Sequence, residues 1–384
     1  MWNALVRSLR SRAPYAPTAH APPRRGDLNS LSDMASRTIP RKVRVARWSR
    51  TIYMVLSLSY AASACTDQSE IRRGDIFAPD VELEAVFARG FFLEGPAVAP
   101  DGLVYFSAII FTEYSGKQAG HVWRFDPRSR KTELFRSPSG MSNGIKFDSD
   151  GSMVMALRAD FGRRCVIRTD MMSRKSVILA GRFAGRALNS PNDLAIDERG
   201  RIYFTDPRYI GHEPVEQPIA GVYRIDRDGS VHLVAHDVGK PNGIVISPDQ
   251  GTLYVSNADP DDSDAASKGA ASLTRNTILA YRLSSDGTAS DRRTFVGFSG
   301  TTMGVDRMTV DADGNVYAAR FSTESGTRGI AVFSPTGDEL AFFPIPQNPT
   351  NVTFGRGEEL RTLYVTSGKI LYRLRVLKPG YHLP

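Results

Sequence analysis

The chain has 384 residues, 41% of them apolar, which is enough to form a substantial core and excludes wholesale disorder. The net charge of +8 comes from residues 1–64, which hold 11 Lys or Arg and two Asp, while the rest holds 38 Lys or Arg against 39 Asp or Glu. Because the folded part is nearly neutral and the chain has only two Cys, nucleic-acid binding, a disulfide framework and a thiolate zinc site are all disfavoured.

Residues 1–64 have the pattern of a disordered segment followed by a signal peptide. A basic stretch after Met34 leads into the apolar run 52–64, which is shorter than the ~20 residues that span a bilayer. Small residues precede Cys65, as in the lipobox of bacterial lipoproteins. We expect export to the periplasm, either with simple cleavage or with membrane anchoring through a lipidated Cys65. Residues 65–80 are expected to form a linker.

Six related segments follow, each with two apolar runs separated by an acidic or Gly-containing turn. They start at Glu94, Asn143, Asn192, Asn242, Asp306 and Thr350. Each is followed by a further strand with its own turn, and units of four short antiparallel strands predict an all-β, six-bladed β-propeller over residues 81–376. The last unit lacks an outer strand, which we expect residues 81–89 to supply, so that the two ends of the chain close the ring. Residues 377–384 are predicted to form a C-terminal tail.

The first strand of each propeller blade lines the central channel, so the six opening residues are expected to be neighbours. They supply two carboxylates, three amides and one hydroxyl. Hard oxygen ligands of this kind suit one divalent ion, with Ca²⁺ preferred, Mg²⁺ and Mn²⁺ as alternatives, and Zn²⁺ disfavoured because it prefers imidazole or thiolate. The two carboxylates balance the charge of such an ion. The structural alternative is a ring of amides that pair with one another.

Five segments carry a resemblance to a known family: EGPAVAPDG, SNGIKFDSDG, LNSPNDLAIDERGRIYFTDP, KPNGIVISPD and PTNVTFG. In this order and spacing they resemble the gluconolactonase branch of the family that also contains senescence marker protein (regucalcin) and the luciferin-regenerating enzyme. The resemblance covers about residues 85–376 and implies a six-bladed propeller with one divalent ion held by Glu94, Asn192, Asn242 and Asp306. It also implies that Asp306 is the general base in lactone hydrolysis. Ser190 replaces an Arg that contacts the sugar acid in regucalcin-type members, so the resemblance specifies no sugar acid.

Lactone hydrolysis requires a polarised carbonyl and a deprotonated water. The ion would polarise the carbonyl, Asp306 would accept the proton, and Asn143 and Asn192 would orient the substrate. Arg163 and Arg208 lie on predicted loops and are candidates for binding an anionic substrate, with solvated loop charges as the alternative. We therefore expect a metal-dependent lactonase that acts on a small-molecule lactone or ester. A non-catalytic, calcium-bound ligand-binding propeller and a protein-interaction scaffold are the alternatives.

Two further expectations follow from strand alternation. Asp193, directly after Asn192, should turn away from the channel and either support the site residues from behind or pack between blades. Tyrosines recur at one position of the second strand and are expected to pack between blades as well; they are Tyr105, Tyr203, Tyr254, Tyr317 and Tyr364.

Overall fold

The computed structural model describes residues 74–110, 120–258, 276–299 and 302–383. The predicted leader, its signal peptide and Cys65 lie outside these residues. No helix in the described ranges is long and apolar enough to cross a membrane.

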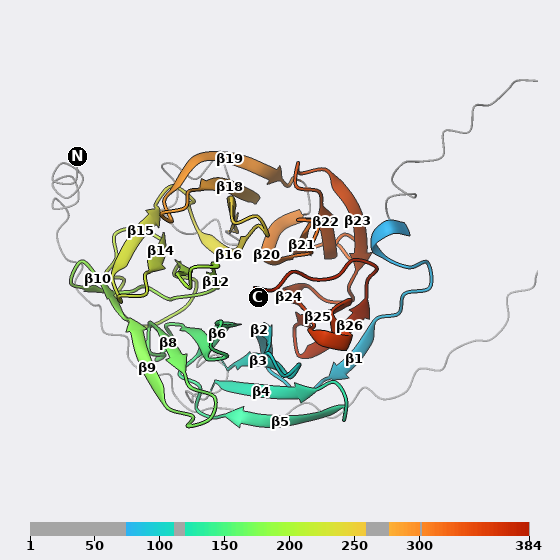
Figure 1. Ribbon diagram of the computed structural model, residues 1–384, viewed down its shortest axis with the longest axis horizontal. Coiled ribbons are helices and arrows are strands. Elements are labelled where there is room, and N and C mark those ends of the chain that lie inside the picture. Colours follow the sequence, from blue (N-terminus) through green and yellow to red (C-terminus); the bar gives the residue numbers. More distant parts are fainter. Residues whose placement is uncertain (1–73, 111–119, 259–275, 300–301, 384) are drawn as a thin grey trace, which may run out of the picture. The chain divides into compact units, whose positions relative to one another are not determined.

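Six four-stranded antiparallel sheets form a ring (Figure 1), which confirms the predicted all-β, six-bladed propeller. In blades 1 to 5 the strands follow chain order from the channel outwards. Their bounds are β2 (Phe92–Val98), β3 (Val104–Ile109), β4 (His121–Asp126) and β5 (Lys131–Arg136) in blade 1; β6 (Ser142–Phe147), β7 (Met153–Leu157), β8 (Cys165–Thr169) and β9 (Ser176–Ala180) in blade 2; β12 (Leu194–Ile196), β13 (Ile202–Asp206), β14 (Gly221–Ile225) and β15 (Val231–Ala235) in blade 3; β16 (Pro241–Ile246), β17 (Thr252–Asn257), β18 (Thr277–Leu283) and β19 (Ala289–Gly297) in blade 4; β20 (Thr302–Val310), β21 (Val316–Ser322), β22 (Gly329–Phe333) and β23 (Glu339–Pro344) in blade 5. A small hairpin, β10 (Arg182–Phe183) with β11 (Arg186–Ala187), connects blades 2 and 3.

Blade 6 is built from both ends of the domain, as predicted. It contains β24 (Pro349–Phe354), β25 (Thr362–Ser367) and β26 (Ile370–Arg375), and its outer strand is β1 (Glu84–Phe87). β1 pairs antiparallel with β26, and Nε of Arg373 donates to Oε2 of Glu84 at 2.6 Å. The added strand covers the edge that β26 would otherwise expose.

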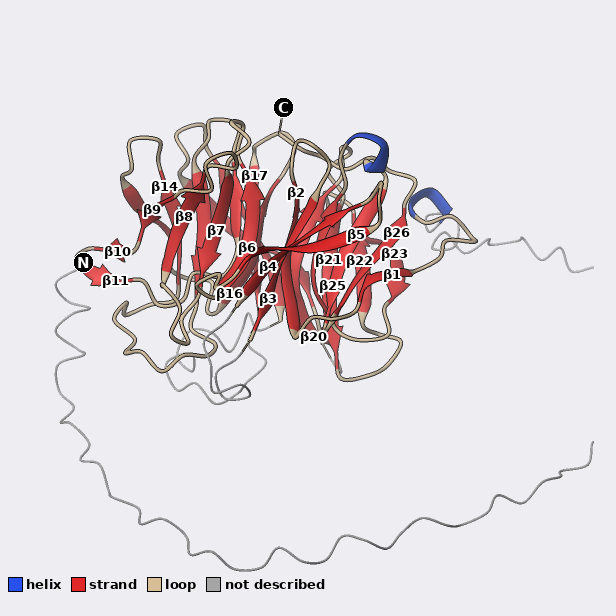
Figure 2. Ribbon diagram, turned by 90° about the horizontal axis from the view of Figure 1, so that it is seen from below, coloured by secondary structure: helices blue, strands red, loops and turns tan. Residues whose placement is uncertain are grey.

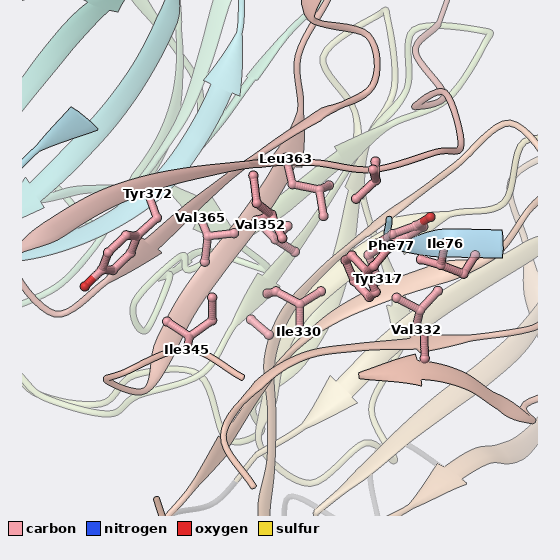
Figure 3. Close-up of a cluster of buried hydrophobic side chains, with 14 of the residues drawn as sticks. Ile76, Phe77, Tyr317, Ile330, Val332, Ile345, Val352, Leu363, Val365 and Tyr372 are labelled. Carbon is pink, nitrogen blue, oxygen red and sulfur yellow. The ribbon is translucent and has the colours of Figure 1, made fainter. Parts of the chain in front are cut away.

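The hydrophobic core is divided into clusters between adjacent blades. Figure 3 shows the cluster between blades 5 and 6, where Tyr317 and Ile330 pack with Val352 and Leu363. Phe77, which precedes β1, is buried in the same cluster. All five recurrent tyrosines are buried, which confirms their predicted packing role; their exposed fractions lie between 0% and 3%.

The C-terminal tail closes one end of the channel. The described part of the tail runs to the centre of the ring in Figure 1 and lies beyond one end of the strands in Figure 2. The backbone N–H of Tyr381 donates to the carbonyl of Val310 at 3.1 Å, and Nε2 of His382 donates to the carbonyl of Gly355 at 2.8 Å. Val310 is the last residue of its channel-lining strand, whereas Asp306 lies four residues earlier. The tail therefore lies at the end of the channel away from the predicted site.

Candidate active site

The channel-lining strands are irregular at the predicted site residues. In blades 1, 2, 4, 5 and 6 the pairing register with the second strand shifts at this position. In blade 1 the shift lies between Glu94 and Ala97, and in blade 5 between Val305 and Met308. In blade 3 the strand begins only at Leu194. A β-bulge interrupts the alternation of side chains, so two consecutive residues can both point towards the axis.

Hydroxyl groups on the second strands hold the backbone at these irregularities. Thr205 of blade 3 donates to the carbonyl of Asn242 in blade 4 at 2.7 Å. Ser256 of blade 4 donates to the carbonyl of Asp306 in blade 5 at 2.9 Å, and Ser107 makes the same kind of contact from blade 1 to blade 2. Each blade in these pairs therefore fixes the site residue of the next.

The side chain of Arg307, the residue after Asp306, lies among the predicted site residues. It is fully buried. Nη2 donates to Oδ1 of Asn143 at 2.7 Å and also to Oδ1 of Asn192, while Nε lies 3.3 Å from Oε2 of Glu94. A single guanidinium from blade 5 thus contacts the site residues of blades 1, 2 and 3.

The predicted site residues also contact one another. Nδ2 of Asn143 donates to Oδ1 of Asn192 at 2.8 Å, and Nδ2 of Asn242 donates to Oδ1 of Asp306 at 2.7 Å. Thr350 differs, because its hydroxyl donates to a backbone carbonyl of blade 1 at 2.7 Å and so belongs to the channel wall. The first five predicted residues are therefore brought into one cluster through Arg307, and the sixth supports it.

The two carboxylates of the cluster differ in exposure. The Asp306 side chain retains 20% of its accessible surface, whereas Glu94 retains 5%. Burial, together with the negative charge of Glu94, raises the pKa of Asp306 well above its ordinary value, and burial also raises the pKa of Glu94. A carboxylate with a raised pKa is a stronger base than an ordinary one. Asp306 is the member of this pair that solvent or a substrate can reach.

The two predicted loop arginines are placed differently. Arg208 donates to the carbonyls of Glu213 at 2.8 Å and Asn189 at 2.9 Å, so it holds its own loop together. Arg163 is exposed, and the methylene groups of its side chain lie against Gly140. The structure brings neither side chain into the contacts that join the axial cluster.

Asp193 takes the expected packing role, but it does not point away from the axis. Its Oδ2 accepts a hydrogen bond from the backbone N–H of Ile244 in blade 4 at 3.2 Å. Its Oδ1 lies 2.7 Å from Nη1 of Arg307. The alternation argument was wrong on the direction because β12 begins only after Asp193.

Two arginines at the site were not predicted. Arg307 contacts the cluster directly, and Arg158 is 6% exposed and close enough for its charge to act on Glu94 and Asp306. A signal for Arg307 was present in the repeat. The residue after the opening residue is Gly in three copies, but Asp193 and Arg307 occupy the equivalent positions in two others, as an oppositely charged pair.

The residue types at the axis suit a divalent ion, but the arrangement of their side chains does not. Oxygens of Glu94 and Asn192 face Arg307, and Asn242 directs its Nδ2 towards Asp306. Oδ1 of Asn242 is the one oxygen of this set that is buried without a hydrogen-bond partner among the described atoms. Ca²⁺ requires six to eight oxygens, so these residues do not fit the predicted ion while Arg307 is in place.

Comparison with known protein families gives a match. The family model of the SMP-30/Gluconolactonase/LRE-like region matches residues 154–369, more than half of the sequence. The chain belongs to the SMP-30/gluconolactonase/LRE-like family. Within related sequences, it is 32% identical over 256 residues to a gluconolactonase from Zymomonas mobilis. That alignment covers 63% of this chain and 64% of the relative, which is less than two thirds of the relative's own length.

Solved structures agree with this family and with the fold. A gluconolactonase from Xanthomonas campestris is 26% identical and superposes with a TM-score of 0.63, covering 79% of this chain and 91% of that one. A regucalcin from Agrobacterium tumefaciens, described as a calcium-binding protein, superposes with a TM-score of 0.60 at 17% identity, covering 79% of this chain and 97% of that one. At that identity the second likeness supports the fold alone.

Proposed function

We propose that the axial site hydrolyses lactones or related esters. The gluconolactonases among the relatives support this reaction class. The observation that carries the proposal is the Asn242–Asp306 pair, in which a 2.7 Å hydrogen bond orients a carboxylate that still reaches solvent. A general base has to be open to the water molecule that it deprotonates, while hydrogen bonds to its other side hold it in one orientation.

In this mechanism a water molecule attacks the lactone carbonyl carbon while Asp306 accepts one of its protons. The new C–O bond forms as the carbonyl π-electrons move to oxygen, which gives a tetrahedral oxyanion. When the intermediate collapses, the ring C–O bond breaks, and the proton held by Asp306 passes to the departing oxygen. The product is the open hydroxy acid.

Two buried arginines offset the negative charge of the axial carboxylates, so that an oxyanion can develop beside them. Arg307 lies against Glu94 and the asparagines, and the charge of Arg158 acts on the same carboxylates. Charges held in a buried site stabilise a developing negative charge more strongly than they would in water, because they need not reorganise during the reaction. Asn143 and Asn192 hold the guanidinium of Arg307 in place through hydrogen bonds with it and with each other.

The resemblance also implies one divalent ion, Ca²⁺ first, on Glu94, Asn192, Asn242 and Asp306. An ion bound there would polarise the carbonyl. The oxygen ligands are of the right chemical type, and a regucalcin with the same fold is described as calcium-binding. Because two of these side chains already face Arg307, no step of the mechanism above depends on the ion.

A lactone panel tests the proposed function. Protein from residue 65 onwards should hydrolyse small sugar or aliphatic lactones, measured by acid release. Asp306→Asn should keep the fold and lose about 10²–10⁴ in rate, because the amide cannot accept the proton. Asp150→Asn, in the exposed turn between β6 and β7, is the matched control and should retain the wild-type rate. A wild-type rate in Asp306→Asn would place the base elsewhere, with Asp160 next to test. Failure of the wild type on every lactone, with lactone binding retained, would favour the ligand-binding alternative.

A further inference from the structure

The axis is tightly packed at the level of Arg307. A Cβ added to Gly243 of blade 4 would lie 2.6 Å from Cα of Arg307, and one added to Gly144 of blade 2 would lie 2.6 Å from Oδ1 of Asp193. Glycine at these positions lets the neighbouring blades approach closely. At the equivalent position blade 5 contributes Arg307, where the other five blades have Gly, Asp or Asn.

Both terminal nitrogens of the guanidinium donate to oxygens, whereas Nε lies near a carboxylate without making a hydrogen bond. Nη1 lies 2.7 Å from Oδ1 of Asp193 and donates to the carbonyl of Asn192 at 3.2 Å. Nη2 donates to the side-chain oxygens of Asn143 and Asn192, and Nε lies 3.3 Å from Oε2 of Glu94. Nε is also 3.9 Å from Oδ1 of Asp306. Carboxylate and amide oxygens from four blades thus surround one cation, as they would surround a metal ion.

The charges around the axis nearly balance without a metal ion. Asp193, Glu94 and Asp306 can supply three negative charges, while Arg307 and Arg158 supply two positive charges. An arginine keeps its charge at any pH that a folded protein tolerates. A divalent ion placed among the same oxygens would lie within a few ångströms of the guanidinium, and two cations at that distance repel each other strongly in a buried site.

We propose that the guanidinium of Arg307 is the built-in cation of this site and occupies the place that the family resemblance assigns to a divalent ion. It acts as a positioning residue, because it is buried and orders Glu94, Asn143 and Asn192 rather than touching the substrate. The wild-type protein then binds no divalent ion at the axis, and its hydrolysis is independent of metal. The activity part of this inference rests on the proposed lactone hydrolysis, whereas the metal-binding part does not.

The decisive experiment measures calcium binding by the wild type and by Arg307→Gly. After dialysis against chelator and then against calcium-free buffer, each protein is titrated with Ca²⁺ by calorimetry and its melting temperature is recorded with and without Ca²⁺. The wild type should bind no Ca²⁺ and should melt at the same temperature in both buffers. Arg307→Gly removes the guanidinium and should bind about one equivalent, and its melting temperature should rise with Ca²⁺ because the ion binds the folded state only.

Two further variants locate the effect. Adding Glu94→Gln to Arg307→Gly should abolish the new calcium binding, because it removes a carboxylate ligand from the same cluster. Arg164→Ala is the matched control: this side chain is also largely buried, but it bonds the carbonyl of Leu188 instead of the axial cluster, so its loss should create no calcium site. If Arg307→Gly does not fold, Arg307→Gln removes the charge while keeping an amide donor, and the same titration applies.

The outcomes separate this inference from the proposed function. A wild type that retains about one equivalent of Ca²⁺, or that is destabilised by chelator, would overturn the inference whether or not it hydrolyses lactones. A folded Arg307→Gly or Arg307→Gln variant that binds no Ca²⁺ would overturn the inference as well. Wild-type hydrolysis that persists in chelator supports it, and hydrolysis that requires added metal contradicts it. If no variant hydrolyses any lactone, the proposed function fails while the calcium titrations still decide the identity of the axial cation.

Discussion

Nη1 of Arg307 in blade 5 lies 2.7 Å from Oδ1 of Asp193 in blade 3, and both side chains are buried. The pair joins two blades that are not neighbours in the ring. Most other contacts between blades involve adjacent sheets, whereas this ion pair links two blades that blade 4 separates.

The first prediction concerns the stability of this pair. Asp193→Asn keeps the shape of the side chain but removes the negative charge opposite Arg307. Removing one partner of a buried ion pair typically costs about 3–5 kcal/mol. Because Glu94 remains 3.3 Å from Nε of Arg307, urea denaturation should show a loss towards the lower end of this range. The control is Asp291→Asn, whose carboxylate pairs with Arg282 at 2.6 Å with both side chains 65% exposed, and there the loss should stay under about 1 kcal/mol. Equal losses in the two variants would contradict the buried pairing.

The second prediction concerns the pH dependence of hydrolysis. A general base has to be deprotonated, and burial with the charge of Glu94 raises the pKa of Asp306 well above 3.8. The value of kcat/KM should therefore fall as the pH is lowered, with a midpoint above that of an ordinary aspartate. A pH–rate profile of the wild type measures this midpoint. A rate that stays constant down to pH 3.8 would exclude Asp306 as the base.

The third prediction concerns Asp206 at the end of β13. Its carboxylate accepts backbone hydrogen bonds from Asn189 at 2.7 Å and Ser190 at 2.6 Å, yet burial raises its pKa to about 7 from 3.8. The folded state therefore holds this proton more tightly than the unfolded state, so the stabilisation is present at low pH and is lost as the pH rises from about 4 through 7.

Asp206→Asn removes this titration. As the pH rises across that window, the free energy of unfolding of the variant should increase relative to that of the wild type, by up to roughly 4 kcal/mol. Urea denaturation at a series of pH values measures this difference. Midpoints of the two proteins that change in parallel with pH would show that Asp206 does not titrate in this range.

The fourth prediction concerns closure of the ring by β1. The Phe87 ring packs against Phe106 and Trp123, with ring centroids 5.3 and 5.2 Å away. Phe87→Ala should lower the stability by about 3–5 kcal/mol, whereas Ala85→Ser at an exposed position of the same strand should change it little. A chain that begins at residue 90 should self-associate on size-exclusion chromatography, because the edge of β26 is then open. A monomeric, cooperatively folding chain from residue 90 would show that closure is dispensable.

The fifth prediction concerns export. The basic and apolar pattern before Cys65 predicts that protein made in an exporting bacterium lacks residues 1–64. Intact-mass spectrometry measures this directly, and a diacylglycerol-sized increment on Cys65 would identify a lipoprotein. A mature protein that still carries Met34 would contradict export by this route.

The architecture was predictable because it repeats. Six copies with Gly-containing turns indicated six blades, and the shortage of one strand in the last copy indicated that residues 81–89 close the ring. The opening residues, Glu94 to Thr350, were located by the same alignment. The repeat therefore predicted the number of blades and the positions of the site residues, which the secondary-structure propensities of single residues do not.

The place of Arg307 in the cluster was not predictable by that reasoning. The alignment took one site residue from each copy and assumed strict alternation for the next. A bulge in β20 allows Asp306 and Arg307 to reach the axis together, and a bulge depends on pairing with the second strand rather than on local sequence. The charge count from the opening residues consequently omitted Asp193, Arg307 and Arg158.

The pairing of Glu84 with Arg373 determines when during synthesis the propeller can close. The two residues are 289 positions apart in the chain, so β1 leaves the ribosome long before its partner strand exists. At a synthesis rate of ~5–20 residues per second, the first strand waits about 15–60 s for β26. Until then the sheet has open edges and the propeller cannot close. Late closure of this kind leaves the nascent chain as a substrate for chaperones, or for a translocation channel that accepts only unfolded protein, throughout its synthesis.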